Sequence, residues 1–159
     1  MLVSDIMTLD PACCTSECTA QEAARRMRKW SMGVLPVVED METHRIAGIV
    51  TDRDLCLGVV ADGRVPAHVT VRECMARAVV CCQAGEPVQR ALQAMRDHHV
   101  RLLPVVDSAR CLVGIISLTD IIRYAALPEA EVIAAVSQIG DPVALAKVRE
   151  KAKEVVVSR

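Results

Sequence analysis

Two segments of this chain place a hydroxyl and a carboxylate three residues apart, directly after an apolar run. They are Gly48-Ile-Val-Thr51-Asp-Arg-Asp54 and Gly114-Ile-Ile-Ser117-Leu-Thr-Asp120. At the start of a helix, such a pair can form a capping box that satisfies free backbone amides. The same groups can hold a ligand, because a carboxylate accepts hydrogen bonds from both hydroxyls of a ribose and a helix N-terminus attracts phosphate. The spacing leaves both interpretations open, and taken alone it favours the cap.

The two segments are copies of each other within an internal duplication. A shift of 68 residues aligns 3–38 with 71–106 and gives 12 identities in 36 positions without a gap. A connector two residues shorter in the second copy then changes the shift to 66, which aligns Thr51 with Ser117 and Asp54 with Asp120. A repeat of this kind predicts that both copies adopt the same fold.

Local patterns predict the same elements in each copy. Helices are expected after a Thr19/Glu22 capping box and from Pro87 as the first helical residue, because apolar side chains follow at helical spacing. Their predicted apolar stripes are Ala23, Ala24 and Met27 in the first helix, and Val88, Ala91, Leu92 and Met95 in the second. Short β-branched runs predict buried strands at 34–38, 46–50, 102–106 and 112–116. Extended segments are expected near 11–14 and 79–82. Short helices are expected to begin at about Asp52 and Leu118.

These elements define an α/β (α+β) chain in which each copy has a small sheet packed by helices. We expect a first repeat at 1–61, a linker at 62–70, a second repeat at 71–126 and a helical tail at 127–159 with two short helices. A copy of 55–60 residues is marginal for a core of its own. We therefore expect the two copies to pack as a pseudo-twofold pair with clefts between them.

Composition excludes several classes of protein. The net charge of -1 argues against a nucleic-acid footprint, and the apolar runs are too short to span a membrane. The first residues lack the basic and apolar regions of a signal peptide, so we expect a cytoplasmic protein with reduced thiols. No nucleophile and base recur at matched positions, so we expect neither an enzyme nor a required cofactor.

The eight cysteines and four histidines have a simpler interpretation than a metal site. Cys13-Cys14 and Cys81-Cys82 recur in the repeat, no C-x-x-C pair occurs, and adjacent residues on a strand point to opposite faces. His98 and His99 are neighbours at a helix end and do not share a helical face. We interpret the cysteines as core or cleft residues, and we keep a thiol or metal sensor as a minor alternative.

The order of the motifs resembles the cystathionine β-synthase (CBS) domain family. Asp5-Ile-Met-Thr8, a helix, Leu35-Pro-Val-Val38 and Gly48-Ile-Val-Thr-Asp-Arg-Asp-Leu55 follow one another, and residues 73–121 repeat the series. The resemblance covers about residues 1–125. It implies a CBS pair, which is a regulatory module that binds adenosine nucleotides in two clefts and commonly forms a homodimer.

The resemblance also implies roles for individual residues. The aspartate would hold the ribose, and the serine or threonine would lie near the phosphate. The first cleft would contain Asp120, Ser117, Thr119 and Arg101, with Met7, Ala12, Met32 and Gly33 from the other copy as its opposite wall. The second cleft would contain Asp54, Thr51 and Arg53, with Met75, Val80 and Val100 as its opposite wall. The position three residues before the strand proline, often basic where phosphate binds, is Gly33 in one copy and Arg101 in the other. We therefore expect the Asp120 cleft to bind more tightly, although Arg101 could equally be a solvated surface residue.

The resulting prediction is a non-catalytic sensor of AMP, ADP or ATP, with S-adenosylmethionine or NAD as further possible ligands. A homodimer and an unidentified regulated protein are the expected partners, without nucleic acid or membrane. A structural or dimerisation module with vestigial clefts is the alternative. Sequence alone does not select the nucleotide, because the chain has one Trp, one Tyr and no Phe to form a stacking wall.

Overall fold

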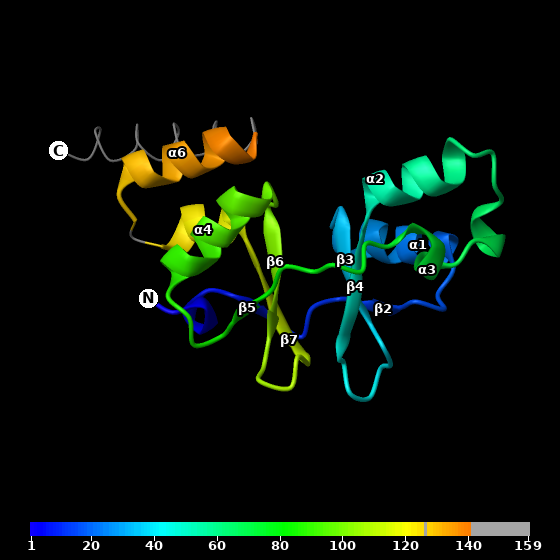
Figure 1. Cartoon of the computed structure of the whole chain (residues 1–159), viewed down its shortest axis with the longest axis horizontal. Helices are drawn as coiled ribbons and strands as arrows, with labels where there is room; N and C mark the ends of the chain where they lie inside the picture. Colours follow the sequence, from blue (N-terminus) through cyan, green and yellow to red (C-terminus); the bar gives the residue numbers. More distant parts are fainter. Residues whose placement is uncertain (126, 141–159) are drawn as a thin grey trace. The chain divides into compact units, whose positions relative to one another are not determined.

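The computed structural model describes residues 1–125 and 127–140, which form two compact units. Figure 1 shows the course of the chain. Among the described residues, unit 1 contains 1–9, 80–105, 113–125 and 127–140, and unit 2 contains 10–79 and 106–112. In this part of the chain, no helix is long and apolar enough to cross a bilayer.

Unit 1 is a four-stranded sheet with three helices. The sheet order is β1-β7-β6-β5, and β1 pairs antiparallel with β7. In chain order, its elements are a 3-10 helix (Val3–Asp5), β1 (Thr8–Leu9), β5 (Cys82–Gln83), α4 (Val88–His98), β6 (Leu102–Val106), β7 (Leu112–Ser117), α5 (Leu118–Tyr124) and α6 (Glu129–Ile139).

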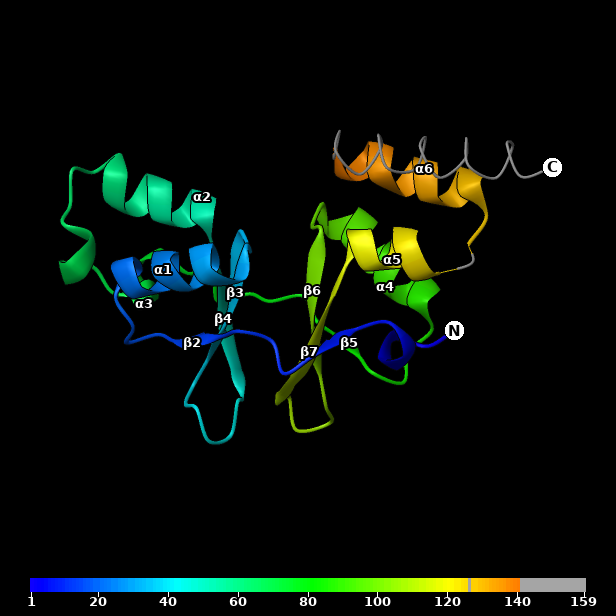
Figure 2. The same cartoon turned by 180° about the vertical axis from the view of Figure 1, so that it is seen from behind.

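Unit 2 is a three-stranded sheet in the order β2-β3-β4, with β2 parallel and β4 antiparallel to β3. Its elements are β2 (Cys14–Thr15), α1 (Ala20–Trp30), β3 (Val34–Val38), β4 (Ile46–Thr51), α2 (Asp52–Leu55), a π-helical continuation (Cys56–Val60), a 3-10 helix (Pro66–His68) and α3 (Val71–Cys74). Figure 2 shows α1 and α2 from behind.

The sequence predictions of strands and helices are confirmed, with two corrections. The predicted capping box forms, because Thr19 Oγ1 accepts from Glu22 N at 3.2 Å and Glu22 Oε2 accepts from Thr19 N at 2.8 Å. Ala24 is exposed, so its assignment to the apolar stripe was wrong; Ala20, one turn earlier, is buried instead. Pro87 is the N-cap of α4 and not its first residue, since its φ of -61° and ψ of 141° are extended.

Each unit has its own apolar core. The core of unit 1 contains the whole predicted stripe of α4, which packs against β6, β7, α5 and α6. Helix α6 buries Val132, Ala135, Val136 and Ile139, whose spacing of three and four residues places them on one helical face. The core of unit 2 joins α1 to β3 and β4 and includes Val69 and Val71.

The segment predicted as a linker, residues 62–70, contains a 3-10 helix and the buried Val69. Val69 O accepts from Ala20 N at 2.8 Å. The second predicted tail helix lies outside the described residues.

The compact units do not coincide with the sequence repeats, because the opening segments are exchanged. Residues 1–9 open the first repeat but belong to unit 1 with β6 and β7, and residues 71–79 open the second repeat but belong to unit 2. Met7 Sδ lies 2.9 Å from where a Cβ of Gly114 would be, and Met75 Sδ lies 2.9 Å from the same position at Gly48. Glycine at these two positions lets the exchanged segment approach closely.

We predict that Gly114→Ala and Gly48→Ala lower the free energy of unfolding by about 1–3 kcal/mol each, as expected for overpacking. Each new methyl group would lie within 2.9 Å of a backbone carbonyl oxygen, Thr8 O or Ala76 O, which cannot move as freely as a side chain. Urea unfolding measures the change. Gly85→Ala is the matched control, because no atom lies within 4 Å of its new Cβ. Equal stabilities of all three variants would contradict the close approach.

We also predict that the cysteines differ strongly in reactivity. Burial raises the pKa of the Cys14 and Cys82 thiols to about 12, whereas Cys56 is exposed. Because the thiolate is the nucleophile, iodoacetamide at pH 8 should modify Cys56 in the folded protein and leave Cys14 and Cys82 unmodified. Peptide mass spectrometry measures this, with urea-unfolded protein as the control in which all eight cysteines react. Modification of Cys14 as fast as Cys56 would show that its burial is wrong.

Candidate functional site

The hydroxyl and the carboxylate of each motif meet at the junction between a strand and a helix. Thr51 is the N-cap of α2 and Ser117 is the N-cap of α5. In unit 2, Asp54 Oδ2 accepts from Thr51 N at 2.8 Å and from Thr51 Oγ1 at 2.7 Å, while Thr51 Oγ1 accepts from Asp54 N at 3.1 Å. The capping interpretation is therefore correct as geometry in this unit.

Unit 1 repeats this junction almost atom for atom. Asp120 Oδ2 accepts from Ser117 N at 2.9 Å and from Ser117 Oγ at 2.5 Å, and Ser117 Oγ accepts from Asp120 N at 3.1 Å. In both units these capping bonds use only Oδ2 of the half-buried carboxylate, so Oδ1 stays outside the cap. The cap consequently fixes the carboxylate without consuming its second acceptor oxygen, and the two interpretations of the motif are compatible.

The residue before β3 in unit 2 and the residue before β6 in unit 1 lie beside these junctions. Gly33 O accepts from Asp52 N at 2.9 Å, and Arg101 O accepts from Leu118 N at 2.8 Å. These equivalent bonds hold Gly33 and Arg101 next to the first residues of α2 and α5. Gly33 and Arg101, which the sequence alignment paired, thus occupy equivalent positions in unit 2 and unit 1.

The charged side chains beside the two junctions differ, since α2 begins with Asp52 and Arg53, whereas Arg101 precedes β6. Asp52 Oδ2 lies 2.9 Å from where a Cβ of Gly33 would be, so a carboxylate occupies the space that a side chain would take. In unit 1 the aligned residue is the buried Leu118, and the exposed side chain before the strand is the cation Arg101. An anionic group is therefore disfavoured beside Gly33 and favoured beside Arg101.

Arg101 has a contact that sequence reasoning missed. Its Nη2 donates to Gly140 O at 3.4 Å, at the C-terminus of α6. A cation at this end of a helix is favourable, because the last carbonyl groups carry partial negative charge. The only signal in the sequence was the Gly140 break, which predicts where α6 ends but not what it packs against.

The other predicted residues divide between the units. Thr119 and Met7 lie in unit 1 with Asp120, and Arg53 and Met75 lie in unit 2 with Asp54. Met7 and Met75, predicted as parts of the opposite walls, thus lie in the same unit as the aspartate. The other wall residues belong to the other unit: Ala12, Met32 and Gly33 to unit 2, and Val80 and Val100 to unit 1. Met7, Val80 and Val100 pack against the core of unit 1, and Ala12 and Met75 pack against that of unit 2, which gives these five a structural role.

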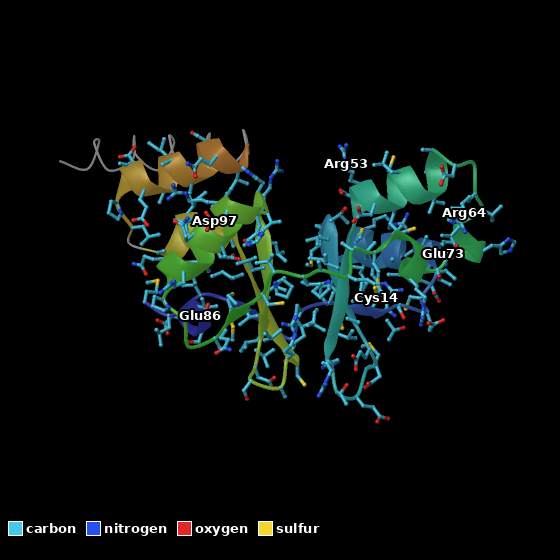
Figure 3. All side chains as sticks on the ribbon, viewed as in Figure 1. Cys14, Arg53, Arg64, Glu73, Glu86 and Asp97 are labelled. Carbon is cyan, nitrogen blue, oxygen red and sulfur yellow. The ribbon has the colours of Figure 1, made fainter. Side chains whose placement is uncertain are left out.

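Figure 3 shows Arg53 extending outward at the start of α2, and it shows Arg64 beside Glu73. Glu73 forms an ion pair with Arg64 and caps α3 by accepting from Thr70 N at 2.8 Å. The Arg64 hydrogen bond and the Thr70 amide lower the pKa of the Glu73 carboxyl to about 2. This ionised cap fixes α3 directly before Met75, the residue that packs over Gly48.

Comparisons with known proteins agree with this architecture. The family model of the CBS domain matches residues 3–60 and 71–127. Hypoxic response protein 1 of Mycobacterium tuberculosis is 35% identical over 142 residues, which are 89% of this chain and 96% of that protein. The CBS domain-containing protein YhcV of Bacillus subtilis is 37% identical over 119 residues, 75% of this chain and 81% of that protein.

Solved structures show the same relationship. A crystal structure of hypoxic response protein I with two coordinated zinc ions has a TM-score of 0.70 at 34% identity and covers 80% of this chain and 100% of that one. The CBS domain pair of protein MJ0100, in complex with 5'-methylthioadenosine and S-adenosyl-L-methionine, has a TM-score of 0.69 at 31% identity and covers 77% of this chain and 94% of that one. With two matched repeats and relatives along most of its length, this chain belongs to the CBS domain family.

Proposed function

We propose that this protein is a non-catalytic sensor that binds adenosine-containing nucleotides through its two strand–helix junctions. The observation that carries the proposal is the carboxylate at each junction, which the cap holds by Oδ2 and leaves with Oδ1 as an acceptor. Asp120 and Asp54 would accept from the ribose hydroxyls, with Ser117 and Thr51 toward the phosphate. The adenosine ligands bound by the CBS pair of protein MJ0100 support this ligand class.

The charged side chains beside the two junctions predict which junction holds the nucleotide phosphate more tightly. Arg101 adds a cation beside Ser117, whereas Asp52 adds a carboxylate beside Gly33. Nucleotide phosphate is therefore held more tightly at the Asp120 junction than at the Asp54 junction. The ligand would regulate a partner by favouring the conformation of the chain to which it binds better.

The zinc of hypoxic response protein I raises a metal sensor as a competing function. In residues 1–125 and 127–140, no group of three or more His, Cys, Asp or Glu side chains could hold a metal ion. Cys14 and Cys82 would also have to lose their thiol protons to bind a metal as thiolates, and burial raises the pKa of both thiols to about 12. The geometry therefore favours the nucleotide.

We predict that Asp120→Ala weakens nucleotide binding at least about tenfold, because it removes a charged hydrogen-bond acceptor. Asp54→Ala should have a smaller effect. Isothermal titration calorimetry with AMP, ADP and ATP measures both variants. Since alanine also removes a helix cap, Asp120→Asn is the control, because it removes the charge but keeps an acceptor oxygen for the cap. A larger loss from Asp54→Ala than from Asp120→Ala would refute the ranking.

A thermal-shift screen separates the sensor from a purely structural module. AMP, ADP, ATP, S-adenosylmethionine and NAD are each added at millimolar concentration. A nucleotide that binds the folded state stabilises it by mass action, by about 2.7 kcal/mol at a concentration one hundred times its Kd. We expect a concentration-dependent rise in Tm with at least one of the five. No shift with any of them would favour the interaction module with vestigial clefts.

A further inference from the structure

Unit 2 contains a pocket of about 380 Å³ beside the C-terminal half of α1. This volume is in the usual range for small-molecule sites, about 300–1,000 Å³. Its lining residues include the basic Arg26 and Lys29, the apolar Trp30, Met41 and Leu112, and the acidic Asp10. Of the residues predicted to surround a nucleotide, only Ala12 is among them.

The two strong cations of the pocket are on the same helix. Arg26 is half-buried, and its Nη1 donates to Cys13 O at 2.5 Å, which fixes the guanidinium at the wall and leaves further N–H groups as donors. Lys29 Nζ lies 5.4 Å from the centre of the Trp30 ring. Burial raises the pKa of the Cys13 thiol, so this thiol stays neutral and does not cancel the Arg26 charge. Asp10 is the one acidic residue in the lining.

The second repeat provides an internal control for what the fold requires. Helices α1 and α4 are equivalent and both have 11 residues. The positions that align with Arg26, Lys29 and Trp30 are Ala94, Asp97 and His98. The same helix therefore folds without the basic pair and without the tryptophan, so packing within the unit does not explain this set.

The rim of the pocket carries further features that folding does not need. Trp30, the single tryptophan of the chain, is 58% exposed, and Met41 is 52% exposed. Asp10 adopts the left-handed backbone conformation, at φ 45°, and the aligned Ala78 of the second repeat does not. Conformations of this kind concentrate at binding sites, where the surroundings compensate for their strain.

We propose that this pocket binds a small organic anion with a flat apolar body. The carboxylate or phosphate of the ligand contacts Arg26 and Lys29, and the apolar body packs against Trp30, Met41 and Leu112. Asp10 accepts a hydrogen bond from a donor on the ligand, which disfavours ligands with several negative charges. The site lies within unit 2 and does not use the Thr51–Asp54 junction.

Titration with 2-naphthoate tests the proposal. The single tryptophan gives one indole N–H resonance in a ¹H–¹⁵N spectrum, which reports directly on the pocket. We expect this resonance to shift and saturate at low millimolar naphthoate or below, and not to shift with the neutral 2-naphthamide. Lys29→Gln and Arg26→Gln should each weaken binding about two- to fivefold, the upper part of the range for one charge contact near the surface. Arg28→Gln is the matched control, because Arg28 is exposed on the same helix and outside the pocket lining.

Several results would overturn this site: no saturable shift, equal binding of 2-naphthamide, or an equal loss of affinity in Arg28→Gln. Lys29→Gln keeps the test valid if Arg26→Gln disturbs the contact with Cys13. The double variant Asp54→Asn/Asp120→Asn separates this proposal from nucleotide binding. It should retain naphthoate affinity, and a loss there would show that the anion binds at the nucleotide site instead.

Discussion

The close approach between a glycine and an exchanged methionine is the contact on which the rest of this structure depends. In each unit, the opening segment of one repeat crosses the strand that carries the motif of the other, over Gly114 in unit 1 and over Gly48 in unit 2. A side chain at either glycine would meet both the methionine sulfur and a backbone carbonyl oxygen. The strand that passes under this contact ends, three residues later, at the hydroxyl that caps the next helix. The same stretch of chain therefore carries both the contact with the exchanged segment and the hydroxyl that caps the next helix.

Duplication preserved the backbone of the junction and allowed its charges to diverge. The bonds from Asp52 N to Gly33 O and from Leu118 N to Arg101 O are nearly identical, as are the two capping boxes. The side chains around them are not, since one junction is flanked by a carboxylate and the other by a guanidinium. The same divergence separates the basic end of α1 from α4. A pair of equal folds thereby presents unequal surfaces, which is a physical basis for distinct ligand affinities in one small chain.

Local signals explain what could be predicted from the sequence. The capping box at Thr19, the β-branched runs of 34–38 and 102–106, and the apolar spacing of α4 each act within a few residues, and each is confirmed. The motif residues were also identified, because their spacing is itself the signal. Three features depend on contacts between distant segments and left no such signal: the exchange of the opening segments, the contact of Arg101 with Gly140, and the Asp52 carboxylate at Gly33. Ala24 shows the same limit, since helical spacing alone does not distinguish the edge of an apolar stripe from its centre.

The central claim, that the capped carboxylates bind adenosine-containing nucleotides, is most directly tested by native mass spectrometry of the full chain purified from cells without added ligand. We expect a bound species whose released mass is that of an adenosine-containing molecule, and its absence from an Asp54→Asn/Asp120→Asn variant purified in parallel. A bound molecule without adenosine, or an adenosine ligand retained in full by that variant, would show that these carboxylates do not bind an adenosine nucleotide.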